Sequence, residues 1–327
     1  AWGDNTYGQL GDGTYGTSNV DKFVPRQVRI GQNESNTKLL TNIKYVAAGA
    51  NSSAAIDQDG LLYVWGNNDN GQLGVDGKIV AYPTLVEALK DNPATPNADE
   101  TILVSAVELS ESHTIIIDAL TKRAYTWGKN DHNQLGYQQS ILNNGKPMTS
   151  PSTENYAKEA HLVTRDKGDL NFLEVASGKN HSVGIVIPAS EAETATQGTV
   201  YAWGDNTHGQ LGLGDETEVA TPKKLAIANV RQISVGEDHT LFLQMNGTVY
   251  ATGNYEHNKL GIYNLSGDLR IPTKVPSFLG ASVVAVSAGT NHGLALYYTT
   301  NAASFGDNSY GPVSYTHLRA HETSLHL

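Results

Sequence analysis

Four histidines recur at one position of a repeated segment, and histidine is the side chain that most readily exchanges a proton or binds a metal ion near neutral pH. They are His113, His181, His239 and His292. Because each repeat contributes one histidine and the repeats form separate units, the four rings have no common point at which to hold one ion. We therefore predict a structural role, in which each histidine and its Ser or Thr neighbour satisfy backbone groups between strands.

Other patterns that carry chemistry are scarce in this sequence. The chain has no cysteine, which excludes disulfides, zinc–thiolate sites and a cysteine nucleophile. Residues 57–60 and 12–14 look like the start of calcium loops, but neither reaches a Glu at the spacing of an EF-hand, and turn formation explains both. The sequence contains no nucleophile elbow, phosphate-binding loop or dinucleotide fingerprint. We expect no enzymatic activity, no cofactor and no metal site.

The elements around these histidines follow from the repeat itself. The segment Trp-Gly-x-Asn-x-x-Gly-Gln-Leu-Gly returns, complete or eroded, at intervals of 50 (253−203) to 76 (203−127) residues. A long period of this kind predicts an array of similar structural units. Large apolar side chains at repeat positions belong in the core of such units. We predict this for the four tryptophans, Trp2, Trp65, Trp127 and Trp203.

Each repeat contains short apolar and β-branched runs bounded by turn residues, which is typical of strands. Asn246-Gly247 between two such runs predicts a tight hairpin, because both residues accept a positive φ. We assign four strands to one unit, at 83–86, 102–109, 113–117 and 124–127. Four-stranded antiparallel units in radial repetition predict an all-β fold, a β-propeller.

The paired motifs, Gly-x-x-His-Ser/Thr and Trp-Gly-x-Asn-x-x-Gly-Gln-Leu-Gly, resemble those of the RCC1-repeat family (regulator of chromosome condensation-like), in its bacterial form. The resemblance covers residues 1–311. It implies a seven-bladed propeller, of which this chain would supply about five blades and thus an incomplete ring. The chain departs from the family pattern at four motif positions, which are Ser52, Ser110, Thr252 and Phe305.

The last residues do not continue the repeat. Gly311 should lead into Gln-Leu-Gly, but residues 312–327 resemble the translation of a sequencing adaptor. We therefore expect a non-native read-through tail there, to be left out of fold reasoning. The chain also opens at Ala1 within a predicted strand. We expect residues 1–311 to be a fragment of RCC1-like repeats, open at both ends.

Charge and composition limit the partners. The net charge is −11, and an acidic surface repels phosphate, which argues against nucleic acids and anionic membranes as partners. The sequence contains no apolar run of the length that inserts into a membrane. The absence of cysteine, with many Asn, Thr, Gly and Tyr, fits an exported bacterial protein. We expect an extracellular or cell-surface location, with the cytoplasm as the alternative.

The antiparallel order places alternate connections at opposite ends of each blade. The end with the Gln-Leu-Gly loops carries half of the sixteen tyrosines and three equivalent histidines. Tyrosine gives a large amphipathic contact area at low entropic cost, so we predict binding there. The predicted binding residues are Tyr7, Tyr15, Tyr82, His132, Tyr137, Tyr156, His208, Tyr255, His257 and Tyr263. The alternative is that these tyrosines pack against their own loops. The opposite end, with polar insertions at 29–42, 87–101 and 188–198, ranks second.

These observations favour a non-enzymatic interaction scaffold that presents propeller loops to a protein or glycan partner, within a larger exported bacterial protein. The resemblance implies two alternatives, guanine-nucleotide exchange on a small GTPase and enzyme inhibition. Exchange needs a wedge hairpin, and no segment looks like one. Inhibition needs matched contact residues, and none can be assigned. Light sensing needs tryptophans outside the Trp-Gly sites, and all four tryptophans lie inside them.

Overall fold

The structure is a computed structural model that divides into two compact units, unit 1 (Ala1–Leu170) and unit 2 (Asn171–Leu327), and each is described by itself. The residues that it describes are 1–16, 24–30, 38–89, 101–137, 156–165, 168–191, 194–276, 282–298 and 301–309. The predicted tail, 312–327, therefore lies outside the described residues, as do most of the insertion at 87–101 and the centre of the insertion at 29–42.

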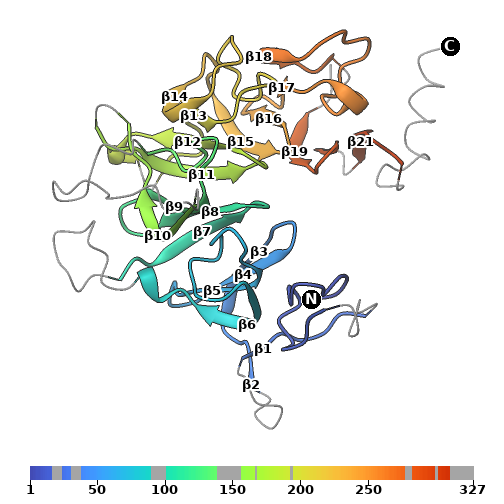
Figure 1. Cartoon of the computed structure of the whole chain (residues 1–327). Coiled ribbons are helices and arrows are strands. Elements are labelled where there is room, and N and C mark those ends of the chain that lie inside the picture. The colour runs from blue at the N-terminus through green and yellow to red at the C-terminus, as the bar shows by residue number, and fades with distance from the viewer. Residues whose placement is uncertain are drawn as a thin grey trace. The chain divides into compact units, whose positions relative to one another are not determined.

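Unit 1 contains two blades, each a sheet of four antiparallel strands in the order of the sequence (Figure 1). The first blade consists of β3 (Ile43–Ala48), β4 (Ser52–Asp57), β5 (Leu62–Asn67) and β6 (Ile79–Leu85). The second consists of β7 (Val104–Leu109), β8 (His113–Asp118), β9 (Ala124–Lys129) and β10 (Tyr156–Leu162). A two-stranded ribbon of β1 (Arg29–Ile30) and β2 (Lys38–Leu39) precedes them.

Unit 2 contains three blades of the same kind. Two have four strands: β11 (Asn171–Ser177), β12 (His181–Ile187), β13 (Thr199–Gly204) and β14 (Val219–Lys224), then β15 (Val230–Val235), β16 (His239–Gln244), β17 (Val249–Gly253) and β18 (Leu269–Lys274). The last has three, β19 (Val283–Ala288), β20 (His292–Tyr297) and β21 (Ala302–Gly306).

The only helices among the described residues are short 3-10 turns at Glu87–Leu89, Ala189–Glu191 and Glu256–Asn258. The predicted all-β fold of antiparallel propeller blades, about five in number, is confirmed.

The predicted grouping of strands into blades was wrong in one respect. The run at 83–86 lies in β6, which pairs with the preceding β5, for example Tyr63 opposite Leu85. It does not join the strands at 102–127, whose fourth partner is β10. Antiparallel strands joined by a loop pair most readily with each other, so the strand after each Gln-Leu-Gly loop closes the blade that it leaves. Its predicted place at the sheet edge is correct.

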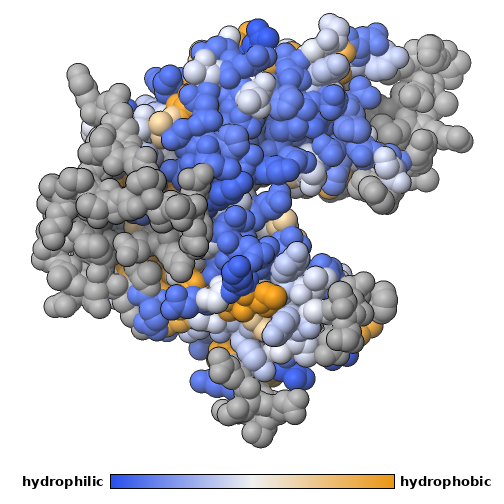
Figure 2. Space-filling model, in the orientation of Figure 1, coloured by the Kyte–Doolittle hydropathy of each residue, from blue (hydrophilic) through white to orange (hydrophobic). Residues whose placement is uncertain are grey.

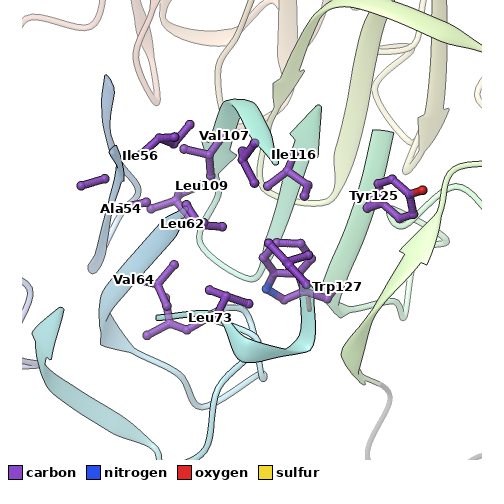
Figure 3. Packing of buried hydrophobic residues seen from close by; sticks show 14 of the residues in the cluster. Ala54, Ile56, Leu62, Val64, Leu73, Val107, Leu109, Ile116, Tyr125 and Trp127 are labelled. Atoms are coloured by element: carbon purple, nitrogen blue, oxygen red, sulfur yellow. The ribbon is translucent and has the colours of Figure 1, made fainter. Parts of the chain in front are cut away.

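Three of the four repeat tryptophans lie in the core, as predicted: Trp65 in β5, Trp127 in β9 and Trp203 in β13 are all buried. Figure 3 shows the ring of Trp127 facing apolar side chains of the first blade, among them Leu62 and Leu73. Trp2 contradicts the prediction, because 67% of its surface is exposed. It lies outside any named strand of the described residues.

The motif histidines are packing elements. A Cβ added to Gly236 would lie 2.0 Å from the His239 ring, and one added to Gly178 would lie 2.4 Å from the His181 ring. The glycine three residues before each histidine therefore makes room for the ring. In the second blade Ser110 replaces this glycine, and its hydroxyl instead lies 2.7 Å from Nδ1 of His113.

The predicted hydrogen-bonding role of these histidines holds only in part. His181 Nε2 lies 3.2 Å from the hydroxyl of Thr240 in the next blade. Both ring nitrogens of buried His239 lack a hydrogen-bond partner among the described residues, so its role is to fill space. His292 is half-buried. The repeats therefore share the packing of the imidazole ring at this position, whereas the hydrogen bonds of the ring differ between them.

An asparagine, buried in three of the loops and half-buried as Asn130 in the fourth, organises each Trp-Gly loop. Its side-chain oxygen accepts a hydrogen bond from the backbone N–H of the Leu in Gln-Leu-Gly. The four donor–acceptor pairs are Leu10–Asn5 at 3.0 Å, Leu73–Asn68 at 2.9 Å, Leu135–Asn130 at 3.1 Å and Leu211–Asn206 at 3.0 Å. The loop is thus tied to the end of the strand that precedes it, and its backbone groups are satisfied without a regular element.

Replacement of Asn68 by alanine should lower the free energy of unfolding by about 1–3 kcal/mol, because it leaves buried backbone groups unpaired. Asn68 also donates to the carbonyls of Val75 and Gly77, both at 2.7 Å. Urea denaturation would measure the change. Asp69→Ala, at an exposed neighbouring position, is the control and should change stability by less than about 0.5 kcal/mol. Equal stability of both variants would contradict this role for Asn68.

Candidate functional site

The Gln-Leu-Gly loops join one blade to the next. In unit 1 the carbonyl of Gln9 accepts the hydroxyl of Ser53 at 2.8 Å, and that of Gln72 accepts the hydroxyl of Thr114. In unit 2 the carbonyl of Gln210 accepts the hydroxyl of Thr240 at 2.9 Å. The hydroxyl follows the motif histidine position in each case. We call these contacts the latches, and they fix the loops as parts of the blade packing.

Several of the predicted binding tyrosines pack against loops or strands of their own blades. The ring of Tyr82 lies over Gly13, where an added Cβ would be 2.1 Å from its hydroxyl. Tyr137 is buried and stacks on His161, with 4.6 Å between ring centroids, and burial raises its pKa. Tyr255 packs against the core of its blades. Tyr137 therefore cannot form part of an exposed binding surface, contrary to the prediction.

The other predicted residues differ in exposure. Tyr15 in unit 1 is 55% exposed and Tyr263 in unit 2 is 86% exposed. His257 is exposed too and has a positive φ of 60°, a conformation that few residues other than glycine adopt. Tyr7 and His132 are half-buried, and the side chain of Tyr156 lies outside the described residues. These residues belong to both units and differ in exposure within each.

In unit 2 two neighbouring loops converge, β13–β14 (205–218) and β17–β18 (254–268). His208 Nδ1 lies 2.7 Å from a carboxylate oxygen of Asp268, whose other oxygen accepts the amide of Tyr255 at 3.1 Å. The guanidinium of Arg270 pairs with Glu216 at 2.7 Å. These contacts hold the loops of two blades together, and the second loop carries Tyr263.

The connections at this end of unit 2 are acidic, and we call them the acidic loop end: residues 178–180, 205–218, 236–238, 254–268, 289–291 and 307–309. They carry nine carboxylates against two lysines. The carboxylates are Asp205, Asp215, Glu216, Glu218, Glu237, Asp238, Glu256, Asp268 and Asp307. Hydrogen bonds from Ser309 hold the pKa of Asp307 below its ordinary value, which keeps it charged. In Figure 2 the described surface of unit 2 is mainly hydrophilic.

Both lysines are paired with carboxylates of the same end, which keeps an excess of seven carboxylates over lysines. Lys179 is bridged to Glu237 at 2.8 Å. Lys259 is buried and donates to Asp238 at 2.7 Å and to the side chain of Asn291 at 2.9 Å. Lys259 stands where the other loops have Gln, so it replaces a neutral side chain by a buried ion pair. The sequence analysis did not predict the Lys259–Asp238 ion pair. Two features of the sequence indicate it: Lys-Leu-Gly in place of Gln-Leu-Gly, and an Asp directly before His239.

Within the described part of the chain, no group of three or more His, Cys, Asp or Glu side chains could hold a metal ion. Among these same residues, no helix has both the length and the apolar character that a membrane crossing requires. The features that distinguish the site are its carboxylates, its exposed tyrosine and its fixed loops.

Antiparallel blades in series, joined by latched loops, define a β-propeller of repeated units. The family model described as RCC1-like domain matches residues 1–317. The chain belongs to the RCC1-like family, which confirms the resemblance seen in its motifs.

Relatives differ widely in overall size. The ultraviolet-B receptor UVR8 of Arabidopsis thaliana is 24% identical over 280 residues, which cover 84% of this chain and 56% of the receptor. The E3 ubiquitin-protein ligase HERC2 of Homo sapiens is 25% identical over 315 residues, which cover 95% of this chain and 6% of the ligase. The chain thus spans about half of one relative and a small part of the other.

Two solved structures support the fold. Human WBSCR16 matches with a TM-score of 0.70 at 19% identity, over 93% of this chain and 72% of that one. Prp20p from Saccharomyces cerevisiae matches with a TM-score of 0.54 at 20% identity, over 93% of this chain and 80% of that one. At these identities the likeness concerns the architecture of the blades.

Proposed function

We propose that the chain is a non-enzymatic scaffold that binds a basic surface of a protein partner through the acidic loop end of unit 2. The observation that carries this proposal is the exposed Tyr263 in an acidic loop end with nine carboxylates, on a loop joined to its neighbour through His208 and Asp268. An exposed tyrosine supplies contact area, and surrounding charge of one sign selects a partner of the opposite sign and steers its approach.

The loop geometry supports binding by a preformed surface. The β13–β14 and β17–β18 loops are joined through His208 and Asp268 and through Arg270 and Glu216. A partner that meets loops already held in place does not have to order them, which lowers the entropic cost of association. The local excess of carboxylates agrees with the net charge of −11.

A protein partner is better supported than a glycan. The solved structures of yeast Prp20p are described as bound to Kap60, and with binding properties to Gsp1p and histones. Histones are basic proteins, so they are suitable probes of an acidic surface. The expected location at a bacterial cell surface stays a prediction from composition.

Binding of purified core histones to the chain, measured by biolayer interferometry, tests the proposal. We expect Tyr263→Ala to weaken binding about tenfold, which corresponds to about 1.4 kcal/mol. Glu256→Lys should slow association, and the difference from the unsubstituted chain should shrink as salt rises. Tyr298→Ala is the matched control, because Tyr298 is 79% exposed in the same unit but follows β20 at the opposite end of its blade.

Equal losses for Tyr263→Ala and Tyr298→Ala would show that the binding is unspecific and would contradict the proposal. Nucleotide release from a small GTPase in the presence of the chain separates the proposal from exchange activity. We expect the release rate to be unchanged, because no described residue forms a wedge at the acidic loop end.

A further inference from the structure

The last strand of each four-stranded blade has a free edge, because within its sheet it pairs on one side only. These strands are β6, β10, β14 and β18 (Figure 1). A free edge presents backbone N–H and C=O groups to which a strand of another chain can add, and proteins commonly block it with proline or lysine. The residues at each of these edges therefore indicate where the chain can pair with another.

Three of these strands carry a proline at the same position, which is Pro83 in β6, Pro222 in β14 and Pro272 in β18. Three residues after each proline, a backbone N–H donates to the neighbouring strand of the blade at 2.9–3.0 Å. Because successive residues of a strand direct their backbone groups to opposite sides, the proline nitrogen faces the free edge. Proline has no N–H, so the edge lacks a donor there while the blade loses no hydrogen bond. A shift of register precedes this position in all four strands, so it does not distinguish β10.

In β10 the same position is an alanine, Ala160. Val163 donates its N–H to the carbonyl of Ala124 at 2.9 Å, and His161 lies opposite Thr126, so the backbone groups of Ala160 face the free edge. Within the described part of the chain, the N–H of Ala160 has no hydrogen-bond partner. The edge of the second blade thus retains the donor that the other three edges lack.

Two copies of β10 can pair as antiparallel strands through this edge, about a two-fold axis at His161. Ala160 of one copy then lies opposite Leu162 of the other. Both residues direct their backbone groups to the free edge, because each is an odd number of residues from Val163, which faces β9. Each N–H of the two residues therefore meets the C=O of the other residue in the second copy, which is the pattern of a hydrogen-bonded antiparallel pair.

Charge favours a second copy as the occupant of this edge. Residues 160–164 contain no Asp, Glu, Lys or Arg, so two copies of a chain with a net charge of −11 can meet there without like charges facing each other. The position of Leu162 is a lysine in the two blades of unit 2, Lys224 and Lys274, and lysine on an edge opposes pairing. The β10 edge also supplies the donors and the acceptors that an identical edge needs, as a symmetric contact requires.

We propose that the chain forms a symmetric dimer in which the β10 edges of two copies pair as antiparallel strands. The contact joins the second blade of one copy to the second blade of the other, and it lies in unit 1. It does not rest on the proposed function of the acidic loop end, which belongs to unit 2. A dimer of this kind carries two acidic loop ends, so a partner with repeated basic sites would bind it with added avidity.

Sedimentation velocity of the full chain over a series of concentrations tests the proposal. We expect a monomer–dimer equilibrium that Ala160→Pro weakens about tenfold or more, because proline removes the N–H at the centre of the contact. This variant should fold, since three other blades have proline at the same position. Ala160→Ser is the matched control, because it changes the side chain and keeps the N–H, and it should dimerise as the unsubstituted chain does.

Amide hydrogen exchange gives a readout that needs no substitution. The amides of Ala160 and Leu162 face away from β9, so their exchange should slow as the concentration of the chain rises and the dimer forms. A chain that stays monomeric throughout the series, or equal self-association of the Ala160→Pro and Ala160→Ser variants, would overturn the proposal. Protection of these amides in a monomeric chain by a synthetic peptide of residues 156–164 would also overturn it, in favour of an extended peptide as the occupant.

Discussion

Gly236→Ala is expected to lower the free energy of unfolding of unit 2 by about 3 kcal/mol, near the upper end of the usual cost of overpacking. The added Cβ would lie 2.0 Å from the ring of His239 and 2.5 Å from the carbonyl oxygen of Gly289. The ring is enclosed, and the carbonyl belongs to the backbone of the next blade, so neither can move without disturbing the core. Hydrogen exchange of the β15 and β16 amides would locate the loss.

Gly267→Ala is the matched control, because no atom lies within 4 Å of an added Cβ there and its φ is not positive. It should be nearly neutral. The double variant Gly236→Ala, His239→Ala removes the ring conflict and keeps the carbonyl conflict, which separates the two causes. A change below about 0.5 kcal/mol for Gly236→Ala would show that the blade accommodates the methyl group, as the second blade accommodates Ser110.

Unit 2 is expected to lose stability steeply as the pH falls below 6.5. Burial lowers the pKa of His181 to about 4, and burial together with the charge of Lys259 lowers the pKa of His239 to about 3. Below pH 6.5 the unfolded chain binds protons that these two folded residues do not, so acid favours unfolding. Each histidine contributes up to about 1.4 kcal/mol per pH unit, until the pH reaches its folded pKa.

Urea midpoints of unit 2 at pH 7.5, 6 and 5, followed by hydrogen exchange, would measure this loss. The ring protons of His181 and His239 should also show no titration by NMR down to about pH 5, which tests the pKa values without any substitution. Titration of either buried ring near pH 6.5 would contradict the prediction.

Unit 1 should respond to pH in the opposite sense through one carboxyl group. Burial raises the pKa of Glu108 to about 7, against the opposing effect of the Tyr45 hydroxyl. The stability associated with this group is present below pH 4.5 and is lost as the pH rises toward 7. Glu108→Gln should therefore stabilise unit 1 at pH 8 relative to the unsubstituted chain and lose that advantage at pH 4. Urea midpoints at both pH values would check the difference, and equal shifts at both would contradict it.

The repeat period and the strand runs predicted most of the fold, because alternating apolar residues between glycine turns allow few structures. The pairing of β6 was not predictable in the same way, since an edge strand has the same pattern whichever blade it joins.

The candidate site was predicted less well than the fold. Tyr137 and Tyr263 follow similar loops in the sequence, yet one stacks on His161 inside a blade and the other is 86% exposed. The difference arises from which loop atoms cover each ring, and composition gives no signal of it. The carboxylates of the acidic loop end come from separate repeats, so the sequence alone does not indicate that they share one end of unit 2.

The latches carry an implication for how such chains change over evolutionary time. Each of the three latches uses a backbone carbonyl from one repeat and a Ser or Thr hydroxyl from the next, as between Gln210 and Thr240. A copied repeat that carries both groups would therefore bring both halves of the joint with it. Such a chain could gain a blade and keep the same kind of contact at the new joint, because the contact uses a backbone carbonyl and a single hydroxyl.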